Sequence, residues 1–208
     1  MKLENLHRAA SIGFMAAGLL LGFSYISHPH HMTATTIASA NWIVIHTMFL
    51  LSLLAGMLGT IGFYLWSARS TGLLGIIGFL AAFVGLMLIS GLDYYEVFIA
   101  PFLAIEFPEV INKHGAGDKM GPVALAFPIS GLLTVMGYML LAFAKLRASV
   151  FSAASLVALL VSAATFGFGL SPLGGLLAAR ITALLFGICL VWSGWEYWRA
   201  ATKLTVSR

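Results

Sequence analysis

Long runs of apolar residues, almost free of charge, limit what this chain can fold into. Six of them lie at about residues 9–27, 41–66, 72–95, 122–144, 149–169 and 175–197. A membrane-spanning helix needs about 20 mostly apolar residues, whereas the strands of a membrane barrel alternate in polarity over about 10 residues. The pattern therefore predicts an all-α integral membrane protein, a bundle of six transmembrane helices that forms a single domain over residues 1–208.

The composition excludes an ordinary water-soluble domain. Charged residues make up 9% of the 208 residues and apolar residues 61%, whereas soluble domains are about 25% charged. The net charge is +4, but the basic residues are scattered singly between apolar runs, which argues for the lipid bilayer and against nucleic acid as a partner. The first run follows Lys2 and Arg8 as in a secretory signal, but about 19 apolar residues are long for a signal core, so we expect a retained span.

The distribution of Lys and Arg predicts how the bundle is oriented. With a cytoplasmic N-terminus, the opposite side of the membrane holds only Lys113 and Lys119, and Arg180 falls within the sixth run. The cytoplasmic segments then hold Lys2, Arg8, Arg69, Lys145, Arg147, Arg199, Lys203 and Arg208. Because cytoplasmic loops carry an excess of Lys and Arg, we expect both termini in the cytoplasm of a multi-pass cell-membrane protein, with the His-rich loop extracytoplasmic.

The third apolar run does not end cleanly. Residues 97–107 form a further apolar stretch that is too short to cross the membrane, and Pro101 disfavours a continuous helix. We expect this stretch to lie at the interface or to overhang the outer ends of the spans. A polar loop, residues 105–121, follows it.

Four of the six histidines lie between residues 28 and 46. Imidazole is the commonest metal ligand and suits zinc, copper and iron, and a titratable group at membrane depth, such as His46, suggests function. We therefore predict His28, His30, His31 and His46 as metal ligands, with copper, zinc or haem as the candidate cofactors. The alternatives are a solvated loop at 28–31 and a neutral His46 bonded to the next helix. Haem would need a second axial ligand, and no other run holds a mid-membrane histidine.

Further ionisable residues are expected near these histidines. Asp93 and Glu96 are three residues apart, so they share one face near the outer end of the third helix. Arg180 enters the sixth run from the same side, and because an unpaired Arg is costly there, Asp93 or Glu96 is its expected partner. We predict that Asp93, Glu96, His114 and Arg180 support a metal site or relay protons. The alternative is an ion pair that only locks two helices together.

These residues leave three functions open. The first is a metal or haem site at the extracytoplasmic end, serving as a redox (oxidoreductase) or metal-handling unit. The second is a transporter or channel for a small solute or a proton, although polar residues below His46 are sparse. The third is a structural subunit that meets other membrane subunits, or a second copy, through Gly-rich helix faces. The sequence contains none of the common catalytic motifs, so enzymatic activity and substrate stay open.

Overall fold

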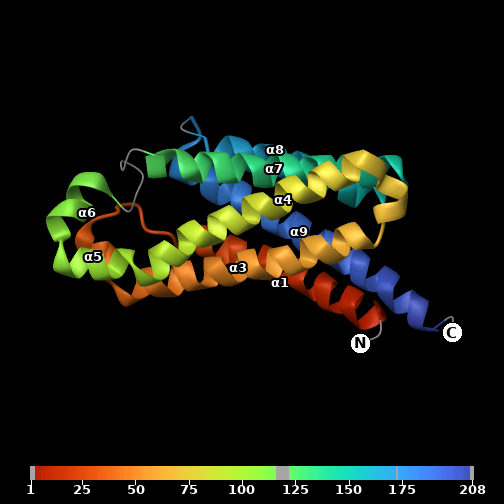
Figure 1. Cartoon of the computed structure of the whole chain (residues 1–208), viewed down its shortest axis with the longest axis horizontal. Coiled ribbons are helices and arrows are strands. Elements are labelled where there is room, and N and C mark those ends of the chain that lie inside the picture. Colours follow the sequence, from red (N-terminus) through yellow and green to blue (C-terminus); the bar gives the residue numbers. More distant parts are fainter. Residues whose placement is uncertain (1–2, 116–121, 172, 207–208) are drawn as a thin grey trace.

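The structure, a computed structural model, describes residues 3–115, 122–171 and 173–206, and within them it contains nine helices and no strand (Figure 1). The prediction of an all-α protein is confirmed. Six helices are long: α1 (Leu3–Ser27), α3 (Ala40–Leu65), α4 (Ala68–Phe98), α7 (Pro122–Arg147), α8 (Ala153–Gly169) and α9 (Gly175–Val206). Three are short: α2 (Ala34–Ile37), α5 (Ala100–Glu106) and α6 (Pro108–His114).

Several of these helices are apolar enough to lie in a bilayer. Within the described residues, five segments have the length and composition to cross a membrane: Asn5–Ser27, Ala40–Leu65, Ala68–Glu106, Ala124–Arg147 and Gly175–Lys203. The predicted span 149–169 corresponds to α8, which is apolar but has 17 residues. At 1.5 Å per residue such a helix is about 25 Å long, somewhat less than the roughly 30 Å hydrocarbon core. Five of the six predicted spans therefore meet the length criterion.

The six long helices form a closed ring. Helix α1 packs on α3 and α9, α4 packs on α3 and α7, and α8 packs on α7 and α9. Both termini lie at one end of this ring, and the short helices α2, α5 and α6 lie together at the other end (Figure 1). The predicted segment 97–107 falls on the end of α4 and on α5. The short helices share a small core with Trp42 of α3, made of Ala34, Ile37, Trp42, Ala100, Ala104 and Ile111.

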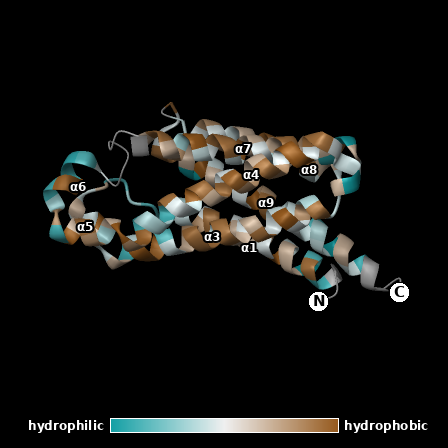
Figure 2. Ribbon diagram, in the orientation of Figure 1, coloured by the Kyte–Doolittle hydropathy of each residue, from teal (hydrophilic) through white to brown (hydrophobic). Residues whose placement is uncertain are grey.

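The outside of the ring is apolar along the length of the helices. Hydrophobic residues run along the long helices, and most hydrophilic residues gather at the two ends (Figure 2). Leu19, Leu73 and Leu177 leave about two-thirds of their surface exposed (66%, 71% and 71%). A monomer in water rarely exposes so much contiguous apolar surface, so this surface is suited to contact with lipid.

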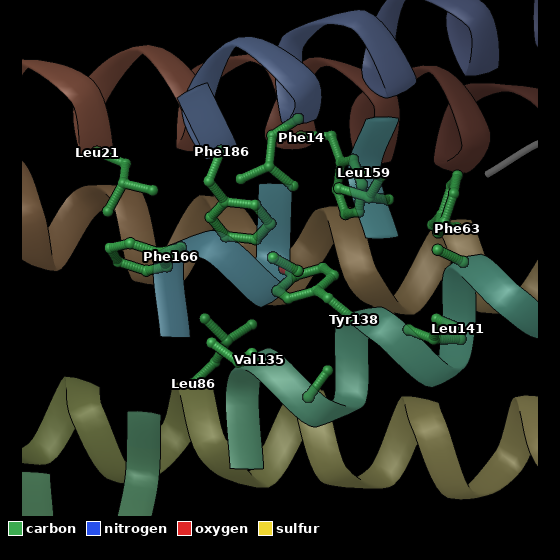
Figure 3. Close-up of a cluster of buried hydrophobic side chains, with 14 of the residues drawn as sticks. Phe14, Leu21, Phe63, Leu86, Val135, Tyr138, Leu141, Leu159, Phe166 and Phe186 are labelled. Carbon is green, nitrogen blue, oxygen red and sulfur yellow. The ribbon is translucent and has the colours of Figure 1, made fainter. Parts of the chain in front are cut away.

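Aromatic and aliphatic side chains together fill the centre of the ring (Figure 3). Tyr138 is 2% exposed, packs edge-on against Phe186 and lies 2.8 Å from the hydroxyl of Thr60 through its own hydroxyl. Phe186 stacks in turn on Phe166, with ring centroids 5.3 Å apart. Because lipid removes the hydrophobic drive between helices, such close packing supplies much of the cohesion of a membrane bundle.

Glycines let the helices approach closely within the chain. A Cβ atom at Gly137 on α7 would lie 2.1 Å from the backbone nitrogen of Ala82 on α4. A Cβ atom at Gly18 on α1 would lie 2.2 Å from the carbonyl oxygen of Gly187 on α9. These glycine faces therefore serve contacts inside the ring, and their use in association with other chains stays a prediction.

Candidate functional site

The candidate site lies at the end of the ring opposite the termini, and local sequence signals place its residues there. Helix α1 ends at Ser27 because Pro29 follows, and the residue before a proline disfavours the helical conformation. The chain returns through α2 to Ser39, whose side chain accepts a hydrogen bond from the backbone N–H of Trp42 and so caps the start of α3. His46 lies one turn after Trp42, so both side chains share one face of α3.

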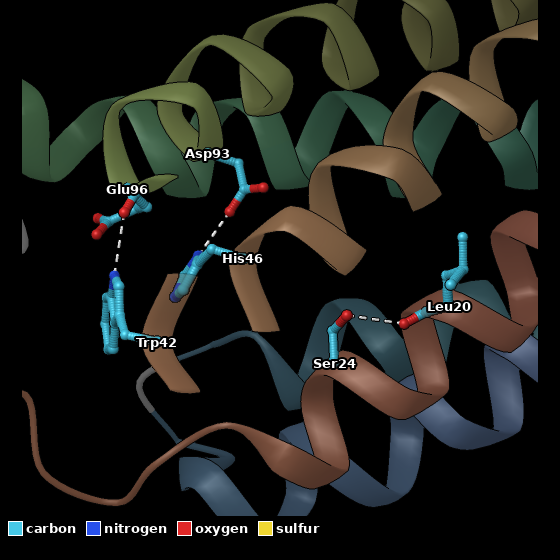
Figure 4. Close-up of polar contacts among 6 residues, drawn as sticks. All are labelled: Leu20, Ser24, Trp42, His46, Asp93 and Glu96. Carbon is cyan, nitrogen blue, oxygen red and sulfur yellow. Dashed lines mark hydrogen bonds and ion pairs between the residues drawn. The ribbon is translucent and has the colours of Figure 1, made fainter. Parts of the chain in front are cut away.

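His46 and Asp93 form a buried pair between α3 and α4 (Figure 4). Nδ1 of His46 lies 2.6 Å from Oδ1 of Asp93, and the two residues are 7% and 3% exposed. The carboxylate accepts, so Nδ1 carries the hydrogen and Nε2 is the free basic nitrogen. Nε2 of His46 and Oδ2 of Asp93 are buried, and neither has a hydrogen-bond partner in the described part of the chain. Such an unpartnered buried atom calls for an explanation.

Two further rings pack against this pair. The Trp42 ring lies 4.3 Å from the His46 ring, and the His28 ring lies 5.5 Å from each of them. Trp42 Nε1 donates to the backbone oxygen of Glu96 at 3.1 Å, which ties α3 to α4 (Figure 4). Trp42 was not singled out from the sequence, although its spacing of four residues from His46 on one helix could have indicated that the two share a face.

His28, like His46, donates a hydrogen bond from Nδ1 to an oxygen atom. Its Nδ1 lies 3.0 Å from the backbone oxygen of Pro29, which can only accept, so Nδ1 carries the hydrogen and Nε2 is left as the basic nitrogen. Burial lowers the pKa of His28; the Pro29 hydrogen bond raises it, and the nearby His46 and Arg180 lower it. The imidazole therefore favours its neutral form.

Arg180 approaches from α9 and holds the segment that carries His28. Its guanidinium donates to the backbone oxygen of His28 and lies 3.1 Å from Nε2 of His30. The sequence suggested Asp93 or Glu96 as its partner. The ring order explains the difference: α9 packs on α1 and not on α4, so Arg180 reaches the end of α1, while Asp93 pairs with His46.

The remaining predicted residues lie away from the pair. His30 and His31 are exposed on the segment between α1 and α2, and His114 is the last residue of α6. No group of three or more His, Cys, Asp or Glu side chains in the described ranges is arranged to hold a metal ion. Of the four predicted ligands, the structure brings together His28 and His46.

The fold and this site define a class: a ring of apolar helices, suited to multiple membrane crossings, with a buried His–Asp pair at one end. Comparisons with protein-family models, with characterised proteins and with solved structures find no match for this chain. Its function is therefore argued from the chemistry of the site.

Proposed function

We propose that this chain is a membrane protein that binds a transition-metal ion through His28 and His46 and handles that ion, or electrons, at the extracytoplasmic face. One observation carries the proposal. Each imidazole gives its Nδ1 hydrogen to an oxygen, Asp93 Oδ1 or the Pro29 carbonyl, and Nε2 of His46 is buried without a partner in the described part of the chain. Ligating histidines in metal sites characteristically donate their second N–H to a carboxylate or a backbone carbonyl.

Asp93 and Arg180 support these ligands in different ways. The Asp93 carboxylate orients the His46 ring, raises the basicity of Nε2 and supplies negative charge that compensates for a cation. Arg180 fixes the backbone at His28. Glu96 acts through its backbone oxygen, which holds Trp42 over His46.

The site favours a small, exchangeable ion. Imidazole ligands suit zinc and copper, and two protein ligands leave coordination positions for exogenous groups. His30 and His31 lie on the same exposed segment as His28 and are proposed as further ligands during entry. The rings of Trp42, His28 and His46 pack within 5.5 Å of one another, which favours an ion over the wider haem macrocycle. His114, the last residue of α6, is assigned no ligand role.

We infer six spans in a single domain with cytoplasmic termini. Helix α8 is the shortest long helix, but it packs between α7 and α9 and closes the ring, so it crosses with its neighbours. The starts of α1 and α4 and the ends of α7 and α9 lie at the end of the ring with the termini (Figure 1). These helix ends carry Arg8, Arg69, Arg147, Arg199 and Lys203. Their number supports the cytoplasm on that side and the site on the extracytoplasmic side.

Metal binding by purified protein tests this proposal. Detergent-solubilised wild-type protein, stripped with a chelator and titrated separately with Zn²⁺ and Cu²⁺, is expected to retain about one ion per chain by elemental analysis. His46→Ala and His28→Ala should each abolish that retention, and His114→Ala is the matched control. Absence of binding by the wild type, or binding that survives both substitutions, contradicts the proposal. Co-purification with other membrane subunits that is unchanged when all four histidines are replaced by Ala would instead favour a structural subunit.

Proton or small-solute transport is the second candidate, favoured by buried polar pairs at three levels of the ring. Below His46 and Asp93 come the Thr60–Tyr138 pair and, near the termini, Lys145 with its partner Ser67. A cavity of about 40 Å³ inside the ring, lined in part by Tyr138, is surrounded mainly by apolar side chains. This lining weighs against a water-filled path through the protein. Proton flux into proteoliposomes that is insensitive to His46→Ala would remove this candidate.

A further inference from the structure

A second hollow lies at the other end of the ring, where α4 begins and α7 ends. It has a volume of about 330 Å³ and is lined by residues 70–74 of α4 and by Ala144, Arg147 and Ala148. Gly72 opens it: its φ of +58° and ψ of −154° interrupt the helical path of α4, and a Cβ atom there would meet nothing within 4 Å. The hollow therefore lies where the candidate span Ala68–Glu106 begins and the candidate span Ala124–Arg147 ends.

The lining of this hollow is polar and cationic. Arg147 supplies up to five N–H donors in a planar fork that suits phosphate. The hydroxyl groups of Ser70 and Thr71 also line the hollow, and both donate their hydrogen to the backbone oxygen of Ser67. No carboxylate is among the described residues that line it. Arg69 lies exposed one residue before Ser70 and adds positive charge nearby. The chemistry is that of a site for a phosphate ester.

An apolar stripe continues from the hollow along the same two helices. Leu73, Ile77 and Leu80 recur at helical spacing on α4 and are 71%, 47% and 51% exposed. Phe143 on α7, directly before Ala144, is 44% exposed. A polar, cationic hollow above an exposed apolar stripe matches a molecule with an anionic head and hydrocarbon chains.

We propose that this hollow binds the phosphate of an anionic phospholipid, with Arg147 as the principal contact and the acyl chains along Leu73, Ile77 and Leu80. Basic pockets between membrane helices near the cytoplasmic surface are suited to anionic lipid head groups. Free phosphate shares the head-group chemistry but gains nothing from the apolar stripe, which favours the lipid as the source. The site shares no residue with the His28–His46 site, so the two proposals fail or stand separately.

Lipid retention by the full-length protein tests the assignment. Delipidated wild-type protein in detergent is offered phosphatidylglycerol or phosphatidylcholine, and bound lipid is counted by native mass spectrometry. We expect selective retention of phosphatidylglycerol, weakened roughly fivefold in Arg147→Gln, the factor expected for one cationic side chain at an anionic surface. The matched control is Arg199→Gln, which removes the same charge from an exposed position on α9 and should retain lipid as the wild type does.

A second variant separates the hollow from the charge. Ala148→Phe keeps Arg147 but fills the space, and it is expected to reduce phosphatidylglycerol retention at least as much as Arg147→Gln. Equal loss in Arg199→Gln, equal retention of both lipids by the wild type, or full retention in Ala148→Phe would overturn the assignment. So would Arg147-dependent binding of inorganic phosphate to protein that shows no lipid selectivity, because the ligand would then be the free ion.

Discussion

Removing the Asp93 carboxylate should weaken metal binding in two graded steps. Asp93 meets His46 at 2.6 Å and is 3% exposed, so water cannot easily replace it. Partners of this kind contribute about 10–100-fold to metal affinity. Asp93→Asn keeps an oxygen that accepts the Nδ1 hydrogen but removes the charge, so we expect a loss near tenfold. Asp93→Ala removes both, so we expect a loss near 100-fold.

The same factors set the size of a thermal shift. An ion at about 100 times its Kd stabilises the folded state by about 2.7 kcal/mol. At the same ion concentration the stabilisation falls to about 1.4 kcal/mol for a tenfold loss and about 0.4 kcal/mol for a 100-fold loss. With about 2–4 °C per kcal/mol for a chain of this size, the metal-induced rise in Tm should shrink from about 5–11 °C to about 1 °C in Asp93→Ala.

The assay compares each variant with and without metal, because Asp93→Ala also disturbs the fold by leaving His46 without its partner. Only the metal-dependent difference in Tm reports on the site. His114→Ala, at the last residue of α6, is the control and should keep most of the shift. A metal-induced shift of wild-type size in Asp93→Ala would refute the idea that Asp93 orients His46 for a metal.

Three further predictions concern the ring itself and can be read from thermal unfolding in detergent. Gly137→Ala should destabilise the folded protein by about 1–3 kcal/mol or more, because its Cβ would lie 2.1 Å from the backbone nitrogen of Ala82. Gly91→Ala, whose Cβ would have no atom within 4 Å, should be tolerated, and equal effects of the two substitutions would refute this packing. Tyr138→Phe should cost about 1 kcal/mol, since it leaves the buried Thr60 hydroxyl without its partner at 2.8 Å, and no change in Tm would argue against that bond. Lys145→Ala should cost about 2–5 kcal/mol through the cavity it leaves, while Lys145→Met, which fills the space, should be close to wild type; a larger loss in Lys145→Met would show that the charge itself is needed.

The existence of the helices could be predicted from the sequence, but which helices pack against one another could not. Uninterrupted apolar runs with Pro or polar breaks between them located all six long helices, because length and hydropathy are local properties. The ends were less accurate: α1 begins six residues before the predicted run, and α9 ends nine residues after it. The partner of Arg180 depends on the order of helices around the ring, which no local pattern contains. Asp93 and His46 could be placed at one level by counting residues, but their direct contact required α3 and α4 to be neighbours.

Two ionisable groups buried at opposite ends of the ring show why the chemistry is assigned to one end. Lys145 is fully buried, but its ammonium group is bonded to Ser67 Oγ and lies 4.1 Å from the ring of Phe63 and 5.2 Å from that of Phe151. Its donors thus meet an oxygen and two aromatic faces, which is sufficient to hold α7 in place. His46 is also buried, but its basic Nε2 has no hydrogen-bond donor in the described part of the chain. Burying a polar atom without a partner costs free energy, and a ligand that binds Nε2 of His46 would remove this cost. A ligand at Lys145 would instead have to displace contacts that are already made.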